Sequence, residues 1–276
     1  MDPDEAQALV ARCLADPPFL VRMIDTAITP EHECFDDSFS TLALTTEQCK
    51  QLEKVQGFIT KVKHNALRRL LPCTFRLLSV TGLELQFFVS FAARYMEARL
   101  SGPLRTTQHF GLLTSALQTF LERVPVEKGA PILDMLSHER LLYELRVKTT
   151  SPDTPNVIIP NPHCRVAYYS FDVVPIAADL TRAPLATSPQ LEERKHFLLY
   201  QADLAAGVVR VREINALMAA IFGQLFTAKT FSAVAQNLST SIGIAVTEAQ
   251  ISKFVDDSIE AGIISSVDAA VFRRPR

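Results

Sequence analysis

The sequence contains no tryptophan and little glycine, with nine glycines among 276 residues. So little glycine excludes a glycine-rich nucleotide-binding architecture and any collagen-like repeat. Long apolar runs are also missing, because Pro72 and Arg76 interrupt the stretch 70–80 and a membrane span needs about 20 apolar residues. The formal net charge is only −2, so the molecule as a whole has no electrostatic attraction to nucleic acid or to anionic lipid.

Signals for export are missing too. The segment Met1–Ala6 is acidic, and no apolar segment follows it, so no secretory signal is visible. The five cysteines are odd in number and scattered, and they form neither a C-x-x-C pair nor a zinc-ligand spacing. We therefore expect reduced thiols in a cytoplasmic protein.

The first 150 residues have the pattern of packed helices. Thr45 precedes a run in which apolar residues recur every three or four positions, which predicts a long amphipathic helix with its apolar seam toward a core. The segment 83–100 is apolar on most sides, as expected in the middle of a bundle. Further helices are expected at 3–16, 110–123 and 131–146, the last opened by its proline.

The pattern changes after residue 150. The segment 151–162 contains four prolines, which is incompatible with a helix or a central strand. We interpret 151–194 as a proline-rich linker that contains one strand, at 165–171, and one short helix, at 174–181.

The last third has a regular order. Two strands are expected at 196–201 and 208–213, the second alternating apolar and charged residues. Three helices follow, at 214–226, after Thr230 and after Thr247, the last with Gln250 completing a capping box. Two strands followed by three helices form a winged-helix arrangement. The predicted fold class is α+β, mostly α: a helical domain at 1–150, the linker, and a winged-helix domain with a small antiparallel sheet at 195–276.

Motifs for catalysis are lacking. The sequence contains no G-x-S-x-G, no P-loop, no H-E-x-x-H and no paired-carboxylate signature. The acidic segment 31–37 contains His32 and Cys34 but matches no defined metal spacing, so a solvated loop is expected there. A stand-alone metalloenzyme that uses this segment stays open as a rival, and we expect a chain that is not an enzyme and holds no cofactor.

The basic face of the helix at 46–71 has two interpretations. Lysines and arginines on one side of a helix are usually just a solvated surface. The same face also suits the docking of an acidic partner.

The winged helix raises the question of DNA binding, in which the third helix enters the major groove. Here that helix carries four acidic residues against one cation, Lys253, and phosphate would repel such a face. A DNA-binding regulator is therefore kept only as the alternative function.

The favoured interpretation is peptide binding at the strand 208–213. An edge strand there would let a guest peptide extend the sheet, and Arg210 and Arg212 suit an acidic guest. The opposing interpretation is that the rest of the chain covers this strand. The pattern does not decide which face of the strand meets the guest. The expected contact residues are Val208, Val209, Arg210, Val211 and Arg212, with Ile251, Phe254 and Asp257 from the third helix.

These residues suggest a family. The segment 195–265, with its two strands HFLLYQ and VVRVRE, the run INALMAAIFGQL and the closing VTEAQISKFVDDSIEAGII, resembles the PqqD-like recognition element of ribosomal-peptide (RiPP) biosynthesis. Upstream, NPHCRVAYYSFDVVPIAADL is similar to accessory subunits that pair with multinuclear non-haem iron enzymes, as in the methanobactin and 3-thiaglutamate pathways. The first 80 residues carry no motif of this family.

The resemblance implies a division of labour. The partner enzyme would hold iron and oxidise a peptidyl cysteine, whereas this chain would form a heterodimer with it, bind the leader of the precursor peptide and present the cysteine. The sequence agrees with this division in showing no metal-ligand set, and we expect neither a membrane nor nucleic acid among the partners of this chain.

Overall fold

The structure is a computed structural model, and it describes residues 3–16, 19–20, 22–23, 45–100, 102, 104–147, 157–161, 163–182, 189–203, 205–225, 230–243 and 245–264. The chain divides into two compact units. The helical unit comprises Met1–Leu133 and Arg182–Ser188, and the sheet unit comprises Asp134–Thr181 and Pro189–Arg276. Each unit is described below by itself.

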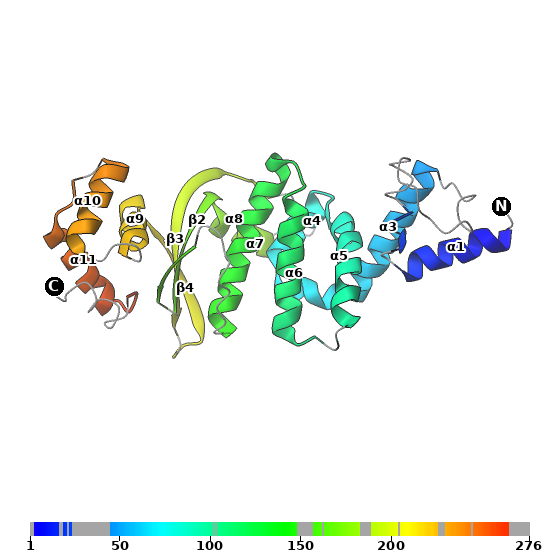
Figure 1. The fold of residues 1–276 in the computed structure, drawn as a ribbon, viewed down its shortest axis with the longest axis horizontal. Coiled ribbons are helices and arrows are strands. Elements are labelled where there is room, and N and C mark those ends of the chain that lie inside the picture. The colour runs from blue at the N-terminus through cyan, green and yellow to red at the C-terminus, as the bar shows by residue number, and fades with distance from the viewer. Residues whose placement is uncertain are drawn as a thin grey trace. The chain divides into compact units, whose positions relative to one another are not determined.

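The helical unit is built from helices (Figure 1), and the core that they enclose is aromatic. Phe75, Phe87, Phe88 and Phe91 are buried, and their neighbouring ring centroids lie 5.5–5.8 Å apart. Most of the apolar residues in the first half of the expected helix at 83–100 are therefore buried, whereas Arg94, Met96 and Glu97 in its second half are exposed. The elements are α1 (Pro3–Ala15), α3 (Thr46–Lys63), the 3₁₀ helix η1 (Asn65–Leu70), α4 (Pro72–Val80), α5 (Glu84–Leu100) and α6 (Thr106–Leu121).

The helix α7 (Val126–Val147) begins earlier than the sequence predicts. The expected first residue, Pro131, lies inside the helix, and Pro125 opens it, since its carbonyl accepts from the amides of Lys128 and Gly129. Pro131 is the sixth residue of α7 and has no N–H to donate to the carbonyl of Glu127, so the helix continues through it with one hydrogen bond fewer.

The sheet unit contains a four-stranded antiparallel sheet in the order β1-β2-β3-β4. Its centre is the long pairing of β2 with β3, and β1 and β4 form its two edges. One helix, α8, connects β2 to β3. The bounds are β1 (Val157–Asn161), β2 (Cys164–Phe171), α8 (Val173–Arg182), β3 (Glu193–Asp203) and β4 (Val208–Ile214).

The expected linker at 151–194 differs from the structure. Its described residues contribute β1, β2 and α8, and β2 pairs with β3 in the same sheet, so the described residues at 157–161, 163–181 and 189–194 belong to the sheet unit. The boundary between the units falls within α7, at 133–134, instead of at 150. The run Val157–Ile159 has a high strand propensity, and Pro160 is tolerated because β1 is an edge strand.

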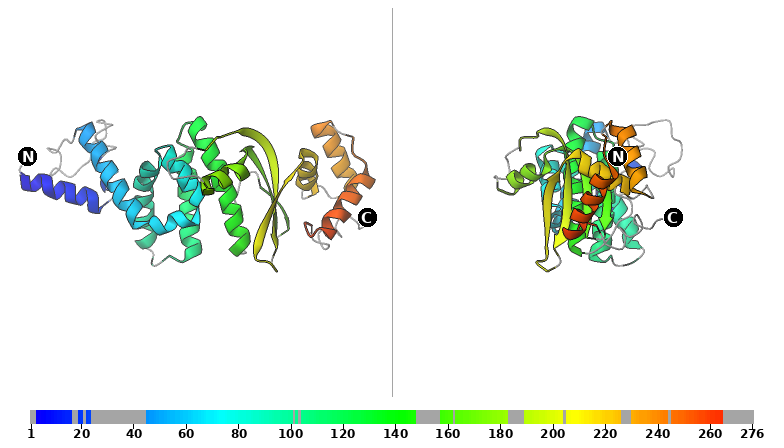
Figure 2. Two further views of the ribbon diagram at one scale, coloured as in Figure 1. Left: turned by 180° about the vertical axis from the view of Figure 1, so that it is seen from behind. Right: turned by 90° about the vertical axis from the view of Figure 1, so that its left-hand side faces the viewer.

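Three helices follow the sheet, as expected: α9 (Ala216–Leu225), α10 (Phe231–Ile242) and α11 (Glu248–Glu260). Thr230 caps α10, and Thr247 forms a capping box with Gln250 at the start of α11. Gly262 follows α11 with a φ of 68°, the left-handed conformation that ends many helices. In Figures 1 and 2, α9 lies between the sheet and α10.

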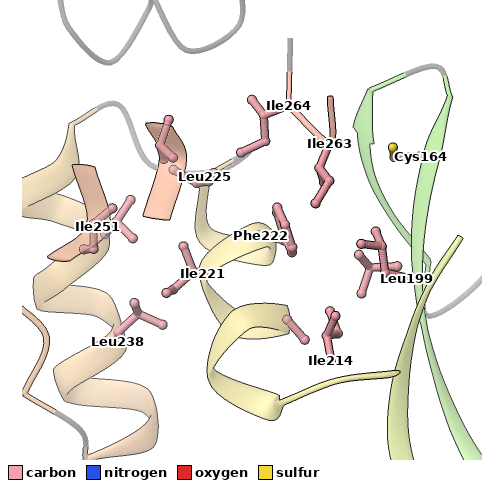
Figure 3. Close-up of a cluster of buried hydrophobic side chains, with 14 residues drawn as sticks. Cys164, Leu199, Ile214, Ile221, Phe222, Leu225, Leu238, Ile251, Ile263 and Ile264 are labelled. Atoms are coloured by element: carbon pink, nitrogen blue, oxygen red, sulfur yellow. The ribbon is translucent and has the colours of Figure 1, made fainter. Parts of the chain in front are cut away.

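The core of the sheet unit joins these helices to one face of the sheet. Figure 3 shows Ile221 and Phe222 of α9 in the middle of this core, with Leu199 of β3 on one side and Leu238 of α10 and Ile251 of α11 on the other. All five side chains are buried. The described chain is therefore an α+β structure, mostly helical, with one small antiparallel sheet. Among the described residues, no helix combines the length and the apolarity needed to cross a membrane.

Candidate functional site

The strand β4 is an edge of the sheet. It pairs with β3 over its whole length, from Asp203 opposite Val208 to Phe197 opposite Ile214. No other described segment forms a backbone hydrogen bond with residues 208–214. In an antiparallel edge strand, alternate residues point both their N–H and their C=O groups away from the sheet. Within the described chain, these outward groups of β4 have no backbone partner.

The register decides which side chains of β4 share a face. Arg212 lies opposite Leu199, and Arg210 lies opposite Gln201. Directly opposed residues of an antiparallel pair point to the same side of the sheet. Since Leu199 belongs to the core with α9, α10 and α11, Val208, Arg210 and Arg212 lie on this helix-facing side.

The two arginines differ in their partners. Both are exposed, and Arg210 donates to the carboxylate of Asp203 at 2.7 Å. Asp203 also accepts from the backbone N–H of Ala206 at 3.0 Å, and this bond, followed by the charge of Arg210, lowers the pKa of Asp203. Arg212 forms no ion pair with the described part of the chain.

Val209 and Val211 lie on the opposite face. Val211 is opposite Tyr200 and Val209 is opposite Ala202, and both valines are half-buried. The five residues expected on β4 therefore divide between two faces. A guest strand beside β4 would place its alternate side chains next to the arginines and next to the valines.

The three residues of α11 that were expected to contact the guest differ in their exposure. Ile251 is 0% exposed and packs in the core of the sheet unit. It cannot contact a guest, and its assignment to the binding site is wrong. Phe254 is half-buried, with its ring centroid 5.0 Å from that of Phe222, and Asp257 is exposed. The helical period explains the error, because the sequence places Ile251 and Phe254 on one side of the helix without giving its depth.

The end of α11 is fastened to the sheet beside β4. The Nε2 of Gln201 donates to the carbonyl of Ala261 at 2.7 Å, and the Cys164 thiol contacts the carbonyl of Gly262 at 3.7 Å. Gln201 is the β3 residue opposite Arg210. This hydrogen bond places the end of α11 near the arginine face of β4.

A buried polar network occupies the other face of the sheet. Tyr200 donates from its hydroxyl to that of Tyr169 at 2.8 Å, and the Nδ1 of His138 on α7 lies 2.6 Å from the Tyr200 hydroxyl. Because the Tyr200 hydrogen goes to Tyr169, the Nδ1–H of His138 donates to the Tyr200 oxygen. Burial lowers the pKa of His138 to about 4 and raises the pKa of both tyrosines, so all three side chains are neutral at pH 7.

Asp134 fixes β2 at its irregular end. Its carboxylate accepts from the backbone N–H groups of Ser170 at 2.7 Å and Phe171 at 3.0 Å, where the pairing of β2 with β3 shifts register. Burial raises the pKa of Asp134, and the two hydrogen bonds oppose that shift. This anchoring role was missed in the sequence, because an aspartate on an apolar helix gives no sign of a distant strand.

A second missed contact lies at the other end of β4. Arg194 of β3 joins Asp172 at 2.7 Å to Glu213 of β4 at 2.7 Å. Arg194 is half-exposed, so the pair contributes little to stability, but it fixes the direction of the Glu213 side chain.

Chemistry based on a metal finds no support among the described residues, which contain no group of three or more His, Cys, Asp or Glu side chains arranged to hold an ion. The acidic segment with His32 and Cys34 lies outside the described residues.

Comparisons with known proteins add no identity. A scan against protein-family models and a search among curated proteins both found no match to this chain.

Proposed function

We propose that the sheet unit binds an acidic peptide in extended conformation along β4, as an added strand of the sheet. The observation that carries the proposal is an edge strand with unpaired outward backbone groups and two arginines on one face. Backbone hydrogen bonds would supply affinity, and the alternate side chains of the guest would supply specificity.

The energies are compatible with reversible binding. Four to six backbone hydrogen bonds would contribute about 1 kcal/mol each. Two or three buried side chains would add about 1.5–3 kcal/mol each. Ordering and association cost on the order of 4–15 kcal/mol. The net free energy therefore ranges from no binding to about −11 kcal/mol, and this range includes the value of about −8 kcal/mol that corresponds to a micromolar dissociation constant.

The identity of the guest rests on the family resemblance. We propose that the two strands and three helices form a winged-helix, PqqD-like recognition element, and that the guest is the leader of a ribosomally made precursor peptide. In this proposal the chain is a non-catalytic subunit, and an iron-dependent oxidase partner modifies the cysteine of the bound precursor.

Binding to DNA is disfavoured by the surface of α11. Glu248, Asp257 and Glu260 are exposed on this helix, against the exposed cation Lys253. DNA affinity depends on cations that displace counterions from phosphate. We expect no binding of random duplex DNA at low salt, and tight binding with a steep salt dependence would support the alternative of a DNA-binding regulator.

The test of peptide binding is charge reversal on β4. We expect the double variant Arg210→Glu/Arg212→Glu to weaken binding of the precursor peptide at least about tenfold, because two attractive charges become repulsive. Isothermal calorimetry measures the affinity, and hydrogen exchange of the β4 amides on peptide addition locates the site.

The matched control is Arg146→Glu/Lys195→Glu, which changes net charge equally at exposed positions of the sheet unit outside β4. We expect this control to bind like the unmodified chain. Equal affinities for all three proteins, with circular dichroism unchanged, would reject the assignment to β4.

A further inference from the structure

The helix α3 of the helical unit turns its apolar face outward. Val55, Phe58, Ile59 and Val62 are 46%, 60%, 41% and 61% exposed. They recur at the helical spacing of three and four residues, so they form one continuous stripe, which we call the α3 apolar face. On the opposite side of the helix, polar side chains are buried, with Gln56 at 2% and Thr60 at 3% exposure. The sequence predicts the reverse, with the apolar seam in the core.

Close packing fixes this orientation. Gly57 lies so near α5 that a Cβ atom there would be 2.8 Å from the carbonyl oxygen of Leu85. The buried carboxylate of Glu84 on α5 accepts from Lys61 at 2.6 Å and pairs with Arg68 at 2.8 Å. Rotation of α3 that buried its apolar face would break both the glycine contact and the ion pair of Lys61 with Glu84.

A lysine row borders the α3 apolar face. Lys50 and Lys54 are exposed one turn apart, and Lys54 precedes Phe58 by one further turn. Neither lysine forms an ion pair with the described part of the chain. Two acidic residues of α3 lie near this row, Glu47 three positions before Lys50 and Glu53 three positions after it, and Glu53 is only half-exposed.

We propose that the α3 apolar face binds an acidic amphipathic helix of a partner protein. An apolar stripe bordered by cations complements a helix whose apolar residues recur every three or four positions, flanked by Asp or Glu. A second copy of this chain fits poorly, because a two-fold antiparallel pairing of α3 with itself places both lysine rows along the same edge. A membrane surface fits poorly as well, because the stripe spans only two turns and the net charge of the chain is −2.

The test uses two labelled helical peptides of about 20 residues with the same leucine pattern, one flanked by glutamates and one by lysines. Fluorescence anisotropy with the full chain measures the affinity for each. We expect the acidic probe to bind about tenfold more tightly than the basic one, the ratio given by two exposed ion pairs. The variant Lys50→Glu/Lys54→Glu should reverse this preference.

Two further variants complete the test. Phe58→Ser/Val62→Ser should lose both probes, whereas Arg146→Glu/Lys195→Glu, at exposed positions outside α3 and β4, should bind the acidic probe unchanged. Equal affinities for the two probes, or a preference that Lys50→Glu/Lys54→Glu leaves unchanged, would overturn the proposal. Self-association in sedimentation, or binding to phosphatidylserine vesicles, that Phe58→Ser/Val62→Ser abolishes would identify a different occupant and would also overturn it.

Discussion

The helices α3 and α11 begin with the same kind of cap, but α11 buries its apolar face and α3 exposes its own. Each starts with a threonine cap and a glutamine three residues on, Thr45 with Gln48 and Thr247 with Gln250, and both capping boxes are complete. Yet α11 buries its apolar residues Ile251 and Val255, whereas α3 exposes its apolar stripe. The cap therefore determines where a helix begins, and the contacts of neighbouring elements determine which face it buries.

The largest expected effect comes from replacing an isoleucine with alanine, in α11 in one variant and in α3 in another. Ile251→Ala should lower the free energy of unfolding of the sheet unit by about 2–5 kcal/mol, because it leaves a cavity in a closed core. Ile59→Ala removes the same atoms from an exposed side chain and should change stability by less than about 0.5 kcal/mol. Urea denaturation followed by circular dichroism measures both, and similar losses would mean that α3 is covered after all.

A pH titration sharpens the contrast between a surface helix and the interior of the sheet unit. His138 has a folded-state pKa of about 4, below the ordinary value of 6.5. As the pH falls, the unfolded chain therefore binds a proton at this histidine before the folded protein does. The contribution of neutral His138 to the free energy of unfolding is complete above pH 6.5 and is lost progressively between pH 6.5 and pH 4. Between these two values the free energy of unfolding should fall by up to about 1.4 kcal/mol for each unit of decrease in pH.

The variant His138→Gln is the control for this titration. It should lack this part of the slope, because glutamine does not titrate and its amide still donates to Tyr200. Unfolding free energies measured from pH 7 to pH 4 give both curves. Parallel curves for the two proteins would contradict the neutral buried state of His138.

The orientation of α3 is tested by two glycines in helices. Gly57→Ala should destabilise the helical unit by about 1–3 kcal/mol through overpacking, since its Cβ meets the Leu85 carbonyl at 2.8 Å. Gly111→Ala in α6 meets nothing within 4 Å and should stabilise by about 0.5–1 kcal/mol. Thermal unfolding of the two variants gives the signs. A neutral Gly57→Ala would show that α3 is free to move away from α5.

The smallest expected effect is the loss of stability on removal of the threonine cap, a feature that the two helices share. Thr45→Ala and Thr247→Ala each remove a capping hydrogen bond at an exposed helix start, and each should cost about 1 kcal/mol. Equal losses in denaturation experiments would confirm that the caps act alike despite the opposite burial of the two helices. A large loss at one of them alone would point to a tertiary role for that threonine.

Many elements of this fold could be predicted from residues close together in the sequence. The threonine caps at 45, 230 and 247, the strands around 196–201 and 208–213 and the apolar helix near 83–100 were predictable, because each depends on residues within a few positions. The placement of β1 was not, since Pro160 indicates a linker unless the neighbouring strand β2 is known.

The candidate site divides in the same way. The strand at 208–213 and its two arginines followed from alternation and from turn residues, whereas its edge position and the register that separates Arg210 from Val211 come from the pairing with β3. The burial of Ile251 and the exposure of Val55 depend on helices that are distant in sequence. Such depth is a property of the assembled core, and a period of 3.6 residues does not contain it.

Because of its ion pair with Asp203, Arg210 on the β4 edge already has a carboxylate partner within the chain. The carboxylate of Asp203, at the end of β3, occupies the position that a carboxylate of the proposed peptide would take, at 2.7 Å from the guanidinium. If an acidic peptide binds β4 as proposed, its carboxylate would replace that of Asp203 at Arg210, so the net electrostatic gain there would be small. The proposed site would then favour rapid exchange of the peptide over permanent binding.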